Sequence, residues 1–170
     1  EVKQELTHSY RFWTNIELEI PCAKQISADD IKIEWRSKSN LSLGLAESDM
    51  GITLTGDKET AQVNCITYYR PPYTVFKYGK KLLTDVPEIV NNPSAWAVYS
   101  IQIKKGKMSF NKNNELMKEL KDKQTIGLLK KFNIHFKGTG KVDWVKLYHQ
   151  NKMVMQEDFN NEEKSSVIWK

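Results

Sequence analysis

The sequence has 170 residues, with 26 basic and 21 acidic side chains and a formal net charge of +5. This length suits one domain with a sizeable core, and a hydrophobic share of 39% excludes a disordered chain. No stretch approaches the roughly 18 apolar residues of a membrane span, and the first ten residues lack the apolar core of a secretory signal. The composition indicates a soluble domain and does not by itself indicate an activity.

Apolar and polar residues alternate with a period of two along most of the chain, which is typical of half-buried strands. The first such run, Phe12–Ile20, stops at Pro21, which cannot continue a sheet ladder. We expect ten to twelve short strands in all. In chain order they are residues 12–20, 31–35, 41–45, 52–54, 62–69, 73–78, 95–104, 108–110, 132–136, 141–148 and 153–159.

The segments between these runs carry turn signals. Two prolines and an Asn-Asn-Pro sequence predict that residues 82–94 form a long connection. Lys104–Lys107 and Asn111–Asn114 are expected as turns, and Gly138–Gly140 as a hairpin turn rather than a phosphate-binding loop. In Glu115–Lys123 the leucine spacing also fits one helical turn, so a strand and a helical turn remain open there.

Many short strands without a convincing helix favour an all-β fold, an antiparallel β-sandwich in a single domain. We expect this domain to span residues 1–160. Residues 161–170 then form a polar C-terminal tail whose last residues, Val167–Trp169, are apolar.

The positive charge comes almost entirely from lysine, since only Arg11, Arg36 and Arg70 are arginines. Nucleic-acid readers usually gather basic residues on one face and use arginine forks. Here the lysines are spread out and interleaved with acids, so a nucleic-acid partner is not expected. Attraction to polyanions such as sulfated glycans remains open.

Cys22 and Cys65 are the two cysteines, and their spacing fits no zinc site. They form either a disulfide that closes a loop of about 43 residues or two buried thiols. Asn40 begins the glycosylation sequence Asn-Leu-Ser. Together these features favour a secreted, extracellular protein, with Cys22–Cys65 bonded and Asn40 glycosylated.

No motif for catalysis or for a bound cofactor is found, so we expect no cofactor and lean against an enzyme. Glu17 and Glu19 have the same strand parity, but outward acids on a sheet are usually solvated surface. Pairs such as Asp29-Asp30 and Asp57/Glu59 could help hold a structural Ca²⁺, although solvated turn acids are the favoured interpretation. The three histidines stand far apart and make no site.

Several aromatic residues fall out of phase with the expected core. Trp13 lies on the polar face of its strand, and Tyr69, Arg70 and Tyr73 surround a stiff Pro-Pro corner. Such rings can stack on sugars while polar neighbours bond to hydroxyls, and a loop cannot easily bury three rings. The alternative is that this corner is only a rigid loop and that the other tryptophans fill the core. These are Trp35, Trp96 and Trp144.

The back half of the chain resembles known families. WAVYSIQIKKGKMSFNKNNELMKEL (96–120) and KFNIHFKGTGKVDWVKLY (131–148) are similar to the strands of jelly-roll and concanavalin A-like lectin domains. Gly140–Leu147 matches the closing strand of galactose-binding-like carbohydrate-binding modules. The farnesoic acid O-methyltransferase-like domain of arthropods is a looser parallel.

The resemblance implies a non-catalytic module with a glycan or polysaccharide as its partner, and the residues we expect to bind it are Tyr69, Arg70, Tyr73 and Trp13. Two alternatives stay open. One is an interaction or structural sandwich that uses the same aromatics to hold a partner protein. The other is a glycan-active hydrolase or lyase on a lectin-like fold.

Overall fold

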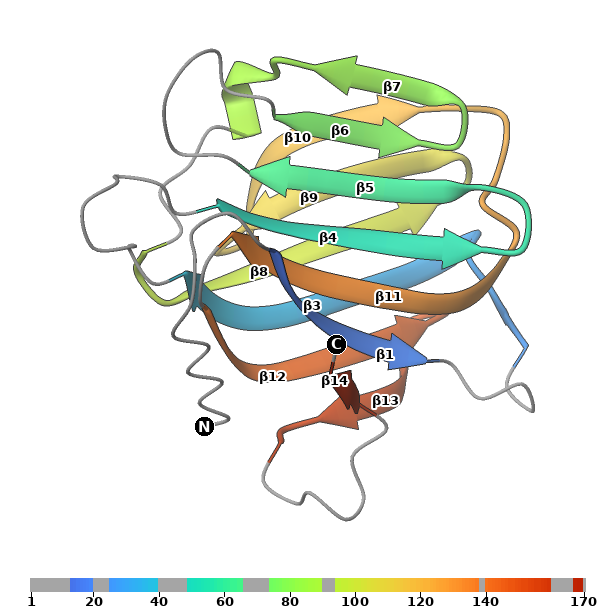
Figure 1. Ribbon diagram of the computed structural model, residues 1–170. Helices are drawn as coiled ribbons and strands as arrows, with labels where there is room; N and C mark the ends of the chain where they lie inside the picture. Colours follow the sequence, from blue (N-terminus) through green and yellow to red (C-terminus); the bar gives the residue numbers. More distant parts are fainter. Residues whose placement is uncertain are drawn as a thin grey trace.

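The computed structural model in Figure 1 describes residues 13–19, 25–39, 49–65, 74–89, 94–137, 140–159 and 167–169. For residues 13–19, 49, 65, 137 and 167–169 it describes the backbone alone. The elements in these ranges are β1 (Trp13–Glu19), β2 (Ile26–Ser27), β3 (Asp30–Ser39), β4 (Asp49–Gly56), β5 (Thr60–Cys65), β6 (Val75–Tyr78), β7 (Lys81–Thr84), the 3-10 helix η1 (Pro87–Ile89), β8 (Ala97–Lys104), β9 (Lys107–Lys112), β10 (Glu115–Lys121), β11 (Leu128–Lys137), β12 (Gly140–His149), β13 (Lys152–Glu157) and β14 (Val167–Trp169).

The strands form two sheets, and every pairing is antiparallel. The order β14-β1-β11-β4-β5-β6-β7 makes one sheet, and β2 joins it as an eighth strand on β11. The other sheet has six strands in the order β10-β9-β8-β3-β12-β13. The sheets lie one behind the other in Figure 1, with buried apolar residues between them. The predicted single antiparallel β-sandwich is confirmed.

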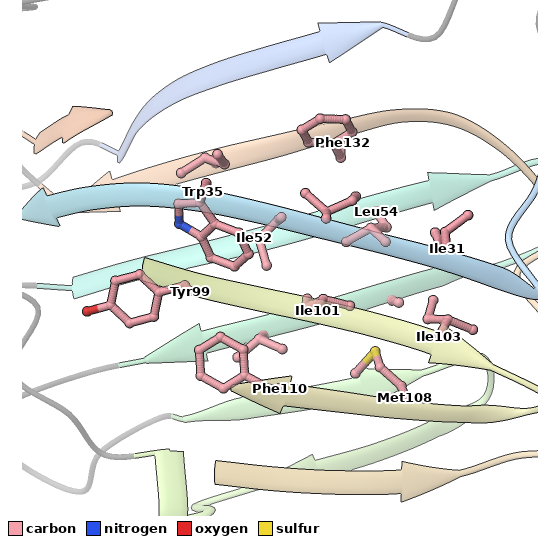
Figure 2. Packing of buried hydrophobic residues seen from close by; sticks show 14 of the residues in the cluster. Ile31, Trp35, Ile52, Leu54, Tyr99, Ile101, Ile103, Met108, Phe110 and Phe132 are labelled. Atoms are coloured by element: carbon pink, nitrogen blue, oxygen red, sulfur yellow. The ribbon is translucent and has the colours of Figure 1, made fainter. Parts of the chain in front are cut away.

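The core follows from the period-2 pattern, because alternate residues of each strand face the other sheet. In β3 this alternation is complete, and Trp35 on its inner face is fully buried. Its ring centroid lies 5.7 Å from that of Tyr99 on β8 and 6.4 Å from that of Phe110 on β9. Figure 2 shows these rings opposite side chains such as Ile52 of the other sheet. A stack of aromatic rings therefore fills one end of the core.

Strand β12 contains an irregularity in its pairing with β3. Its sequence places apolar residues on both faces of a regular strand. The register with β3 shifts between Val142 and Trp144, as at a β-bulge, which lets one strand present two residues against one. Val142 and Val145 are consequently both buried, although three positions apart, and Trp144 is only half-buried.

Two expected turns are confirmed and one is wrong. Lys105 and Gly106 join the paired strands β8 and β9 with φ angles of 51° and 75°, as a tight type I′ hairpin requires. Asn113 and Asn114 do the same between β9 and β10. The expected hairpin at Gly138–Gly140 is wrong because β11 and β12 belong to different sheets, so the chain crosses between layers there.

The strand boundaries differ from expectation where the strands are short or irregular. The expected connection at 82–94 contains the end of β7 and the helix η1, and the ambiguous segment 115–123 holds β10. The apolar residues at the end of the expected tail form β14, which pairs with β1. The expected strand at 41–45 lies outside the described residues. Within the described ranges no helix is long and apolar enough to cross a membrane.

Replacing the Tyr78 hydroxyl should not destabilise the protein. Tyr78 is fully buried, and its hydroxyl has no hydrogen-bond partner among the described residues. Burial, followed by the charges of Asp29 and Asp122, raises the pKa of Tyr78 to about 12. Because a buried unsatisfied hydroxyl costs about 1–3 kcal/mol, Tyr78→Phe should leave the free energy of unfolding unchanged or raise it by about 1 kcal/mol. Urea denaturation measures this, with Phe76→Leu as a destabilised reference; a clear loss in Tyr78→Phe would contradict the assignment.

Candidate functional site

The outer face of the eight-stranded sheet carries neutral polar residues where β11, β4 and β5 lie side by side (Figure 1). In one row, His135 pairs with Gly51, and Gly51 pairs with Asn64. A second row lies two residues further along each strand. We call the six residues of these two rows the His135 surface: Gly51, Thr53, Gln62, Asn64, Asn133 and His135.

The geometry of this surface depends on the absence of a side chain at Gly51. Neighbouring strands are about 4.8 Å apart, so His135 on β11 and Asn64 on β5 belong to strands separated by about 10 Å. A Cβ atom at Gly51 would lie 2.1 Å from His135 Nε2 and 2.5 Å from Asn64 Oδ1. The imidazole can therefore extend across the backbone of β4 and hydrogen-bond to Asn64 only because position 51 is glycine.

Asn64 is the centre of a small hydrogen-bond network. Its Oδ1 lies 2.9 Å from His135 Nε2 and accepts a bond of 3.2 Å from Gln62 Nε2. With Oδ1 as the acceptor, His135 donates through a protonated Nε2. Among the described residues, no partner is found for Asn64 Nδ2 or for Gln62 Oε1. An amide donor and an amide acceptor are thus held in place and remain available to a ligand.

The surface is electrically neutral near pH 7. His135 is only 8% exposed, and burial lowers its pKa to about 4. Charged groups lie beside this surface: Lys77 on β6 donates to Thr60 Oγ1 at 2.7 Å and lies 3.8 Å from a Glu59 carboxylate oxygen. Fixed neutral donors and acceptors are suited to hydroxyl groups rather than to ions.

Of the binding residues expected from the sequence, the structure describes only the backbone of Trp13. Trp13 pairs with Lys137, two residues from His135 along β11, although its side chain is not described. The chain leaves β5 one residue after Asn64 and enters β6 at Val75. Tyr69, Arg70 and Tyr73 belong to that intervening segment and lie outside the described residues. Their role stays a prediction.

The remaining sequence-based assignments are not tested by the structure. Cys22 and Asn40 lie outside the described residues, and of Cys65 only the backbone is described. In the described ranges no group of three or more potential metal-ligating side chains is found. Asp57, considered for Ca²⁺, accepts the backbone N–H of Leu128 through Oδ1 at 2.7 Å.

The three tryptophans considered as core residues divide between two environments. Trp35 is in the core, whereas Trp96 and Trp144 are half-buried. The Arg36 guanidinium lies 4.5 Å from the centroid of the Trp96 ring, and the Lys146 ammonium lies 4.6 Å from that of Trp144. Cations therefore already lie over these two rings, which leaves them less suited than the His135 surface to receive a sugar.

The sequence interpretation missed His135, because a single histidine in an alternating strand carries no motif. A signal was present in Gly51, a glycine inside the apolar pattern of β4, since such glycines often mark a close approach. The partner that approaches Gly51 comes from a strand more than 80 residues later, and sequence spacing does not reveal that pairing.

Comparison with protein-family models finds no match, and comparison with curated protein sequences finds none either. Solved structures do share the fold. CG-16, a homodimeric agglutinin from chicken liver, is 8% identical with a TM-score of 0.53, over 79% of this chain and 99% of that one. Sheep galectin-11 in complex with glycerol is 10% identical with a TM-score of 0.52, over 74% and 95% of the two chains.

The apo Crh5 transglycosylase is 12% identical with a TM-score of 0.50, over 91% of this chain and 81% of that one. At such low identity the likeness concerns the fold alone. The fold is the jelly-roll β-sandwich that the galectin and the agglutinin share, and the resemblance drawn from the back half of the sequence is confirmed as a likeness of fold. The looser parallel with the farnesoic acid O-methyltransferase-like domain stays a prediction.

A methyl group at position 51 should disrupt the site. In Gly51→Ala the new Cβ overlaps His135 Nε2 and Asn64 Oδ1, so one side chain must move and their hydrogen bond is lost. We expect a loss of about 1–3 kcal/mol in the free energy of unfolding, typical of an overpacked site. Thr53→Ala, which removes atoms at the next outward position of β4, is the matched control. Equal stability of Gly51→Ala and wild type would contradict the described contact.

The neutral state of His135 should make the protein acid-sensitive. The unfolded chain takes up a proton near pH 6.5, whereas the folded one does so only near pH 4. This contribution to stability is present above pH 6.5 and is lost as the pH falls towards 4, by about 3 kcal/mol. Urea denaturation at pH 7 and pH 4 measures this loss of the free energy of unfolding. The part due to His135 should be absent in His135→Gln and present in His149→Gln. The same acid loss in both variants would show that His135 is not responsible.

Proposed function

We propose that this protein binds carbohydrate on the His135 surface, outside the cell and without turning the ligand over. The support is chemical and architectural. The surface offers fixed neutral donors and acceptors on the outer side of the sheet, and two proteins with the same fold carry the lectin names galectin and agglutinin.

The observation that carries the proposal is the double acceptance at Asn64 Oδ1. Because His135 and Gln62 both donate to this oxygen, the Asn64 amide cannot rotate without losing two bonds. Its Nδ2 donors therefore have one fixed direction before a ligand arrives. Such preorganisation reduces the entropy lost on binding, which matters for sugars because each hydroxyl exchanges water for protein at little net gain.

Aromatic residues would supply the apolar part of the site. We assign Tyr69, Tyr73 and Trp13 as rings that stack on the C–H face of a pyranose, with Arg70 bonding to its hydroxyls. Chain order supports this, since the segment 66–73 begins directly after β5 and Trp13 begins β1. An extracellular location, a Cys22–Cys65 disulfide and glycosylation at Asn40 belong to the same proposal.

Catalysis is the main alternative, because a transglycosylase shares the fold. Glycan hydrolysis usually needs two carboxyl groups about 5–9.5 Å apart across the scissile bond. None of the six residues of the His135 surface is acidic. Acidic residues beside it are Glu17 of β1, whose backbone pairs with that of Asn133, and Glu59, whose carboxylate lies 3.8 Å from the Lys77 ammonium. A partner protein in place of a glycan is the other alternative.

A glycan array with wild type and three variants tests the proposal. Gln62→Ala removes a ligand-facing amide without breaking the His135–Asn64 bond, and Asn64→Ala removes the centre of the network. Both should lower the signal for the preferred glycan at least tenfold relative to wild type. Trp144→Ala, on the other sheet, is the matched control and should bind as wild type does. Circular dichroism and the thermal midpoint confirm that each variant is folded.

Each other result overturns part of the proposal. Loss of binding in Trp144→Ala with retention in Gln62→Ala moves the site to the six-stranded sheet. Glycan binding by a folded Tyr69→Ala/Tyr73→Ala double variant removes the role of the aromatic corner. Release of products from a bound polysaccharide establishes turnover, and a wild-type protein that binds no glycan ends the carbohydrate assignment.

A further inference from the structure

A second surface, far from the His135 surface, is strongly basic. The turn after β8, the end of β10 and the start of β7 line a cleft of about 1080 Å³. These segments lie at the right of Figure 1. Six lysines line the cleft: Lys81, Lys104, Lys105, Lys107, Lys121 and Lys123. We call it the lysine cleft. Among the described lining residues only Asp29 and Asp122 are acidic, so these residues carry a surplus of four positive charges in a chain whose total is +5.

Most of this charge has no carboxylate partner among the residues that the structure describes. Lys107 pairs with Glu119 at 3.0 Å, and the Lys81 ammonium donates to the backbone oxygen of Lys121. The other ammonium groups, of Lys104, Lys105, Lys121 and Lys123, have no carboxylate partner among the described residues. Like charges around one hollow repel each other, and an anion bound there would relieve that repulsion.

We propose that the lysine cleft binds a sulfated oligosaccharide. The volume of the cleft is at the upper end of the roughly 300–1,000 Å³ of sites for drug-sized ligands, so a single inorganic anion would leave most of it empty. The amide of Gln102 and the hydroxyl of Ser109 also line the cleft, and these neutral groups can bond to sugar hydroxyls. The site uses other strands than the His135 surface and does not depend on the proposed function.

The lining residues favour this ligand over other polyanions. Within the described part of the chain no aromatic ring lines the cleft, whereas single-stranded nucleic acid sites combine basic groups with rings on which bases stack. Its described lining residues include no large apolar side chain either, whereas proteins that lie on anionic membranes insert such side chains. Lysine ammonium groups, unlike arginine forks, act as point charges that suit separated sulfate groups.

The test is a titration of the whole chain with a fluorescent heparin-derived hexasaccharide at 0.05, 0.1 and 0.2 M NaCl, read by anisotropy. The variant is Lys104→Gln/Lys105→Asn/Lys123→Gln, with asparagine at 105 because that residue has a φ of 51°. The control is Lys58→Gln/Lys130→Gln/Lys152→Gln, whose lysines are exposed and lie outside the cleft. Both triple variants lower the net charge equally, and all the changed side chains are at the surface.

The proposal predicts that the cleft variant binds at least tenfold more weakly at 0.1 M NaCl, while the control changes less than twofold. Wild-type affinity should fall as salt rises, and the desulfated hexasaccharide should not bind. Equal weakening in both variants would show that only net charge matters and would overturn the site. Tighter binding to a twelve-residue oligothymidine or to phosphatidylserine vesicles would overturn the ligand, and failure of wild type to bind would overturn both.

Discussion

The polar surface of this sandwich depends on a glycine, Gly51, in the middle of three paired strands. Strands β11 and β5 are separated by β4, and a histidine on the first can reach an asparagine on the second only where the strand between them has no Cβ. Gly51 provides that gap. Because Gly51 has no side chain, the His135 imidazole lies buried on the outer face of the sheet. Desolvation keeps the ring neutral, and Asn64 Oδ1 accepts the hydrogen bond from its Nε2. A flat sheet surface thereby acquires a rigid, uncharged set of hydrogen-bonding groups.

The core of the sandwich holds these three strands in register. On β11, β4 and β5 the residues between the outward ones are fully buried, among them Ile134, Ile52 and Val63. Because strand parity is fixed by this burial, a slip of one residue would turn the polar rows into the core. The packing of the core thus holds the register of the polar rows, and stability and the proposed recognition depend on the same strand pairing.

The His135 surface and the lysine cleft differ in their chemistry and in their place on the fold. The His135 surface is neutral and lies towards the end where β5 finishes, whereas the lysine cleft is charged and lies at the opposite ends of the strands. A neutral sugar and a sulfated one would therefore meet different parts of the fold. The separation allows each to be tested with its own variants and its own salt dependence.

Much of the fold could be predicted from the sequence, because alternation in segments such as β3 and β8 follows directly from burial on one side of a sheet. The placement of β11 and β12 in different sheets could not, since a Gly-rich turn has the same local chemistry in a hairpin and in a crossover. The only sign of the bulge in β12 was that Val142 and Trp144 would lie on one face of a regular strand and Val145 on the other. The site was harder to predict than the fold. An aromatic residue can be noticed by itself in a sequence, whereas the residues of the His135 network come together only when three strands pair in register.

The most direct test is an NMR titration of the His135 ring between pH 8 and pH 4, followed through its Nε2 and Cε1 resonances. We expect a neutral ring protonated at Nε2, with no change in its resonances until the pH approaches about 4. In the Gly51→Ala variant this behaviour should be lost. A ring that titrates near pH 6.5 in the folded wild-type protein would contradict the buried contact with Asn64 and the site built on it.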